Sequence, residues 1–151
     1  VHRHAATCLG LAVGLWSAAM SRRIWLAPTG FAATLLIGAL LAQSGFALPA
    51  VEPVIAASVL LAGLLVMTRS HLPEAAAVAV AAGFALFHGA AHGQELGAPS
   101  SLGGMVLATA LLHCLGIAMG LPLKSRSLWW QRIAGAGIAL AGAGLAAGLM
   151  S

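Results

Sequence analysis

The sequence predicts an all-α polytopic membrane protein, and three observations lead to this prediction. Of the 151 residues, 61% are hydrophobic and only 7% are charged, whereas a soluble domain carries about a quarter charged residues. The mean hydropathy is +1.01, which leaves too few polar side chains to cover a water-facing surface. The 6 prolines fall at or near the ends of apolar runs, where they interrupt helices. We therefore expect a single transmembrane helical domain over residues 1–151, in contact with the lipid bilayer.

The apolar runs predict a bundle of about six spans, each near the roughly 20 residues needed to cross a membrane. They cover residues about 5–20, 29–48, 52–68, 74–96, 102–121 and 129–149. The first span is short, and the second could begin near Ile24 with Pro28 in its first turns. The 19 glycines predict close packing of helices through small residues. Gly89 and Gly93 in the fourth span are read as packing glycines. Both a monomer and a homo-oligomer are compatible with this composition.

The distribution of charge predicts which ends of the spans face the cytoplasm. Six of the 7 basic residues belong to alternate loops, hence to one side: Arg22, Arg23, Arg69, Lys124, Arg126 and Arg132. The other side carries Glu52, Glu95 and, among the basic residues, only Arg3. Because basic loops stay in the cytoplasm, both termini are predicted to lie outside. The pI of about 10.6 reflects basic loops beside an anionic leaflet, so no nucleic-acid partner is expected.

An outward N-terminus raises the question of how the first span inserts. Insertion in this direction needs a preceding signal peptide or another means of placing the N-terminus outside. The sequence begins with Val1, and a processed form, a fragment and a wrongly set start all stay open.

Ionisable residues interrupt the fourth expected span. Residues 87–95 read Phe-His-Gly-Ala-Ala-His-Gly-Gln-Glu. Ionisable groups at bilayer depth are costly and are therefore functional candidates. At about 100° per residue, His88, His92 and Glu95 fall within about 60° of one another on a helix. Two imidazoles and a carboxylate on one stripe can converge on a divalent metal, so we predict a metal or proton pathway here. A solvated, interfacial Glu95 stays open.

His113 in the fifth span extends the candidate chemistry. It lies about 12 residues, or roughly 18 Å, from the outer end of its helix, and His88 lies about 9 residues, or roughly 13 Å, from the outer end of its own. The short connection around residues 97–101 predicts antiparallel neighbours, which would place both histidines in one layer. A purely interhelical hydrogen-bonding role for His113 is the alternative. His4, above the first span, is a further candidate ligand or part of an unstructured terminus.

The run over residues 87–95 resembles the FHGxAHGxE signature of the HupE/UreJ family, the hydrogenase and urease accessory membrane proteins. Residues 11–16, 56–60 and 108–113 are similar to its first, third and fifth helices. The resemblance implies a small permease for nickel, or cobalt, that serves metalloenzyme maturation in the bacterial inner membrane, and not an enzyme. It implies His88, His92 and Glu95 as the metal path, supported by His113. Ni²⁺ or Co²⁺ would be the transported ion, with no cofactor bound permanently.

One motif of the family is not matched in this chain. The family carries HPxxGxDH at the outer end of the first helix, whereas residues 1–7 contain no aspartate and place Arg3 beside His4. A non-transporting, N-terminally degenerate accessory protein therefore stays open. So does a b-type haem protein with His88 and His113 as axial ligands. The chain has no GxxxxGK[ST] motif for ATP hydrolysis, and both facilitated diffusion and proton coupling stay open.

Overall fold

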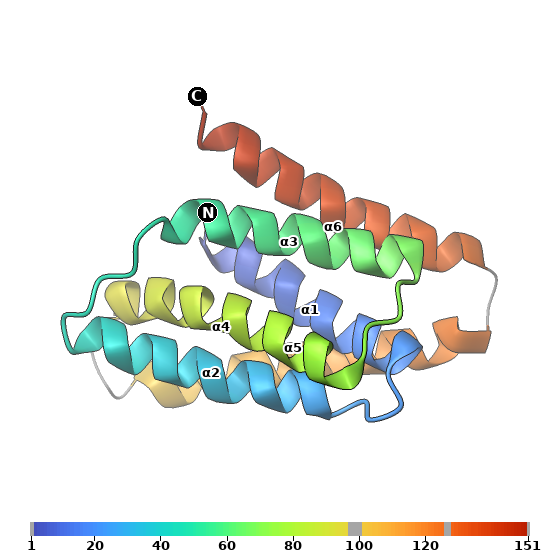
Figure 1. Cartoon of the computed structure of the whole chain (residues 1–151), viewed down its shortest axis with the longest axis horizontal. Coiled ribbons are helices and arrows are strands. Elements are labelled where there is room, and N and C mark those ends of the chain that lie inside the picture. The colour runs from blue at the N-terminus through green and yellow to red at the C-terminus, as the bar shows by residue number, and fades with distance from the viewer. Residues whose placement is uncertain (1, 97–100, 126–127, 151) are drawn as a thin grey trace.

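The computed structural model describes residues 2–96, 101–125 and 128–150, and these residues form six helices and no strand (Figure 1). The helices are α1 (His2–Met20), α2 (Leu26–Gln43), α3 (Val51–Thr68), α4 (Glu74–Leu96), α5 (Ser101–Ser125) and α6 (Leu128–Gly148). They run up and down beside one another in one elongated bundle. The predicted all-α class and the predicted number of helices are therefore confirmed.

The bundle exposes many large apolar side chains on its surface, unlike a soluble protein, and buries a few polar side chains within a mainly apolar interior. One exposed stripe along α5 consists of Leu107, Leu111, Leu115 and Met119. The buried polar side chains are Ser17, Ser58, His88, His113 and Gln131. Such an exposed apolar stripe finds a favourable environment in lipid. Four helices, α2 to α5, are long and apolar enough by themselves to cross a membrane, and the apolar part of α1 is shorter. The chain is a multi-pass membrane protein, and crossing by α1 and α6 stays a prediction.

The end of α2 differs from the sequence prediction. We expected the helix to continue to residue 48, just before Pro49, but it ends at Gln43. Gly45 follows with a φ of 90°, a conformation that residues with a Cβ rarely adopt. This turn lets the Phe46 N–H donate to the Leu41 carbonyl at 3.0 Å, as in a Schellman helix end. The backbone freedom of Gly45, and not the proline, sets the boundary.

The end of α5 also differs from the prediction. The helix continues to Ser125, although the expected end was residue 121, just before Pro122. A proline this close to a helix end removes only one of the last backbone hydrogen bonds, so the helix tolerates it. Gln131 of α6 then donates from Nε2 to the Leu123 carbonyl at 2.9 Å. This bond satisfies one of the carbonyls that the end of α5 leaves open.

The six helices pack mainly as three close pairs: α1 with α5, α2 with α4, and α3 with α6. A glycine is buried in each pair where two backbones meet. A Cβ added at Gly14, Gly89 or Gly63 would collide with the backbone of α5, α2 or α6, respectively. Close backbone approach at small residues is how helices associate in lipid. By contrast, α4 and α5, which we expected to be antiparallel neighbours, touch at only a few points.

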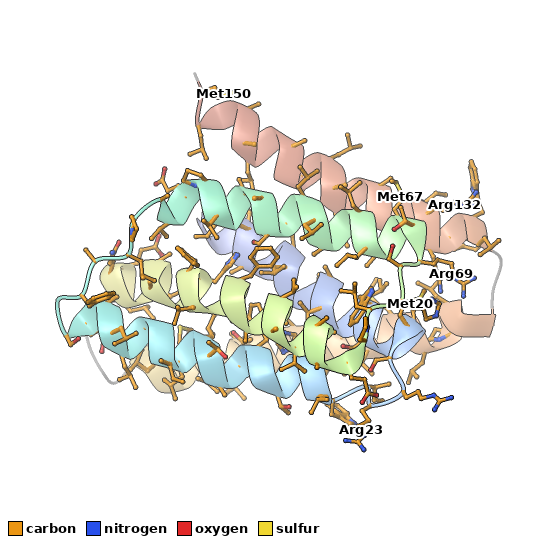
Figure 2. The ribbon with its side chains drawn as sticks, in the orientation of Figure 1. Met20, Arg23, Met67, Arg69, Arg132 and Met150 are labelled. Atoms are coloured by element: carbon orange, nitrogen blue, oxygen red, sulfur yellow. The ribbon has the colours of Figure 1, made fainter. Side chains whose placement is uncertain are left out.

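The two ends of the bundle differ in charge. Arg23, Arg69 and Arg132 lie at one end, which we call the arginine end, and Met150 lies at the other (Figure 2). Both chain termini lie at that other end, which we call the termini end (Figure 1). The prediction that these three arginines share one side is therefore confirmed, although Arg132 lies in α6 and not in a loop. Which end faces the cytoplasm stays a prediction.

Candidate metal path

Residues 87–95 of α4 present two different faces. Gly89 and Gly93 face α2, because a Cβ at either position would collide with the α2 backbone. His88, His92 and Glu95 follow one another at intervals of four and three residues, which places them on one stripe of the helix. The interpretation of the two glycines as packing residues is confirmed.

The three polar residues of this stripe line one cavity. It has a volume of about 480 Å³ and takes its lining from α1, α2, α4 and α5. Its polar lining consists of Thr7, His88, His92, Glu95, Ser101 and Thr109, and the rest is apolar. We call this space the histidine cavity. Because Ser101 begins α5 and Glu95 lies near the last residue of α4, the cavity belongs to the termini end of the bundle.

Exposure falls steadily along the stripe. The Glu95 side chain is 39% exposed and the His92 side chain 17%, whereas His88 is 1% exposed. The His92 Nδ1 atom lies 4.0 Å from Glu95 Oε2, which is too far for a direct hydrogen bond. The stripe therefore leads from an accessible carboxylate to a buried imidazole.

His88 is held by a residue of α3. Its Nε2 atom lies 2.9 Å from the Ser58 hydroxyl oxygen, and this hydroxyl donates to the Ile55 carbonyl at 2.7 Å. The sequence analysis did not single out Ser58. The signal that could have found it is its polarity within an otherwise apolar span, where a polar side chain needs a partner.

Phe31 of α2 contacts both buried histidines. Its ring centroid lies 6.4 Å from that of His88 and 5.2 Å from that of His113, with the latter pair edge-on at 87°. The two histidines thus approach the same ring, although α4 and α5 hardly touch. His113 is 2% exposed, and within the described part of the chain its Nε2 has no hydrogen-bond partner. His113 does not line the histidine cavity.

Phe31 also lines a second space, which we call the apolar pocket. This pocket has a volume of only about 40 Å³ and reaches toward the arginine end. Its other lining residues are Leu9, Ala12, Val13, Trp16, Ala27, Ala62, Leu65, Leu72, Ala77, Val80, Ala81 and Phe84. Phe31 is therefore a wall shared by a roomy, partly polar space and a narrow, apolar one. No pattern in the sequence singled it out.

Some of the expected ligands are not brought together. His4 is an exposed residue of α1 and does not line the histidine cavity. Across the described ranges, no three His, Cys, Asp or Glu side chains gather closely enough to hold an ion. The arrangement is a series of separated groups and not a cage. Metal binding by His88, His92, Glu95, His113 and His4 stays a prediction.

These features define a multi-pass helical membrane protein with a cavity lined by histidine and glutamate at one end. The chain belongs to the HupE/UreJ family, because the family profile described as HupE / UreJ protein matches residues 7–145. It is 38% identical over 144 residues to Protein HupE of Rhizobium leguminosarum bv. viciae, an alignment that covers 91% of this chain and 75% of that protein. No solved structure matches it. The resemblance seen in the sequence is confirmed, and the chain is an accessory membrane protein of the hydrogenase and urease kind.

Proposed function

We propose that the chain is a permease that passes Ni²⁺ across the bacterial inner membrane toward the cytoplasm, for the maturation of hydrogenase or urease. The observation that supports this best is the fall in exposure from Glu95 through His92 to His88 along one helix face. A hydrated cation can meet the carboxylate first and then exchange water for imidazole as it moves inward. Family membership supports the accessory role.

The spacing of the groups suits transient binding. Metal bonds to imidazole nitrogen and carboxylate oxygen measure about 2.0–2.2 Å for a small divalent ion, so two ligands of one ion lie at most about 4.3 Å apart. The 4.0 Å between His92 Nδ1 and Glu95 Oε2 is within this limit. An ion that has only one or two protein ligands at each position is bound weakly enough to be released, as conduction requires.

The membrane potential can drive such an uptake. Moving a divalent cation inward is favoured by about 4.6 kcal/mol at 100 mV, twice the value for a single charge. This is enough for facilitated diffusion without ATP. Nitrogen ligands hold Ni²⁺ more tightly than Co²⁺, which is why we propose nickel as the cargo. An excess of cobalt that abolishes nickel uptake would reassign the cargo to both ions.

Uptake of radioactive nickel by cells that express single variants tests the proposal. We expect His88→Ala and His92→Ala each to lower uptake at least tenfold while the protein still reaches the membrane, because each removes a ligand beside an existing cavity. His71→Ala is the matched control, since His71 is exposed outside the helices. If either cavity variant takes up nickel like the parent, the proposed path is wrong and a non-transporting role is favoured.

Reporter fusions test the proposed direction. Because six of the 7 basic residues fall in or next to the connections predicted on one side, we expect that side to be cytoplasmic. Fusions at Ser70 and Ser125 should report the cytoplasm, and fusions at Pro99 and Ser151 the outside. Labelling of a cysteine at Ser125 by an impermeant reagent from outside would reverse the orientation, and with it the direction of the path.

A further inference from the structure

Two atoms that contact the Ser58 hydroxyl oxygen determine where its hydrogen lies, the Ile55 carbonyl oxygen and His88 Nε2. Ser58 is fully buried, and its Oγ lies 2.7 Å from the Ile55 carbonyl oxygen. Two oxygens this close need a hydrogen between them, and a carbonyl has none to give. The single hydrogen of the hydroxyl is therefore directed at Ile55.

The contact with His88 follows from this assignment. Because the Ser58 hydrogen is already used, the Ser58 oxygen can only accept in its 2.9 Å contact with His88 Nε2. An acceptor oxygen requires a hydrogen on Nε2. A neutral imidazole carries one N–H and one nitrogen lone pair, so the lone pair of His88 must be on Nδ1.

We propose that Ser58 is a positioning residue that fixes the tautomer of His88, so that Nδ1 is the atom with which His88 binds the transported cation. Histidines that bind metals commonly donate their other ring N–H to an outer partner, which orients the ring and selects the binding nitrogen. Here the partner comes from α3, a helix whose sequence carries no metal-binding pattern. The identity of the cation rests on the proposed function, whereas the assignment of the His88 tautomer is independent of it.

Nitrogen NMR on the purified full chain in lipid tests the tautomer without any transport. Protein labelled with ¹⁵N in histidine would be measured near pH 8, where imidazoles are largely neutral. The signals missing from His88→Asn identify those of His88. We expect a proton on Nε2 in the parent and in Ser58→Thr, and a mixture of tautomers in Ser58→Ala. A proton on Nδ1 in the parent overturns the proposal.

Nickel uptake then tests the consequence. Loss of an outer partner typically weakens metal binding 10- to 100-fold, so Ser58→Ala should raise the nickel concentration for half-maximal uptake about that much. Ser58→Thr should restore it, because threonine keeps a hydroxyl that can bond a preceding carbonyl in a helix. Ser17→Ala is the control, since Ser17 is equally buried and, among the described residues, its hydroxyl has no hydrogen-bond partner.

The outcomes separate the two proposals. A Ser58→Ala protein with the parent's concentration dependence overturns the role of Ser58 in binding, whatever its effect on the tautomer. If the parent takes up no nickel, the proposed function fails, while the NMR measurement still decides the tautomer of His88.

Discussion

Gly89 and Gly93 on one face of α4 meet the α2 backbone with no room for a Cβ, whereas the stripe of His88, His92 and Glu95 borders a cavity of about 480 Å³. Both faces belong to the same nine residues. On the glycine face a single added carbon must displace a helix. On the histidine face a side chain can be shortened into existing space. The residues for helix packing and those of the proposed ion path therefore alternate along one segment, and the two sets should respond to different substitutions.

The largest effect is expected on the glycine face. Gly89→Ala places a Cβ against the Leu35 carbonyl of α2, and overpacking of this kind costs about 3 kcal/mol, or more where backbones must separate. We expect a sharp loss of folded protein from the membrane, measured by protein level and by thermal unfolding in detergent.

Gly83→Ala is the matched control for this change. Gly83 lies in the same helix, and a Cβ there meets nothing within 4 Å. Alanine is also the better helix former by about 1 kcal/mol, so the Gly83 variant should be as stable as the parent or slightly more so. Equal losses in the two variants would mean that the α2–α4 contact does not limit assembly.

An intermediate effect is expected at the exposed end of the histidine face. Glu95→Gln keeps the size of the side chain but removes its charge, so uptake at limiting nickel should fall several-fold and recover in part at high nickel. Glu74→Gln at the arginine end serves as the control. Salt screens exposed charges over about 8–10 Å, so a loss that shrinks in high salt indicates attraction at a distance, and a constant loss indicates direct binding. Parent-like uptake at limiting nickel in low salt would leave Glu95 a solvated boundary residue.

The smallest effect is expected at His113, which borders Phe31 and not the cavity. His113→Ala removes an edge-on ring contact with Phe31, and such contacts contribute about 0.5–1.5 kcal/mol. A modest fall in thermal stability with nickel uptake within about threefold of the parent is the expected result. Uptake as low as in His88→Ala would instead place His113 on the ion path and extend the chemistry to α5.

The number of helices and most of their bounds could be predicted from composition and from the prolines. The predicted ends of α2 and α5 were wrong because we placed them at prolines, whereas other residues determine where these helices end. The turn at Gly45 ends α2 before Pro49 is reached. Helix α5 continues through Pro122, and Gln131 of α6 bonds one carbonyl beyond it, that of Leu123. The error at α2 concerns a local turn at a glycine, whereas the bond at the end of α5 forms only when α6 is in place.

The candidate site could be predicted along one helix and not across helices. Periodicity was sufficient to place His88, His92 and Glu95 on one stripe, because a helix fixes the relative direction of its own side chains. It could not supply Ser58 or Phe31, since these reach the histidines only through the pairing of helices. Glycines occur in all six helices, so the sequence does not specify which glycine-rich faces meet.

Under the proposed permease function, the position of Phe31 bears on how fast ions can pass. Phe31 lines both the histidine cavity and the apolar pocket, so an ion that moved past His88 on this side would enter a narrow, apolar space of about 40 Å³. Each passage then needs a rearrangement of packed side chains or helices, and collective motions of helices take microseconds to milliseconds. We expect saturable, strongly temperature-dependent turnover of the kind shown by carriers, in which the protein's own motion and not diffusion of the ion sets the rate.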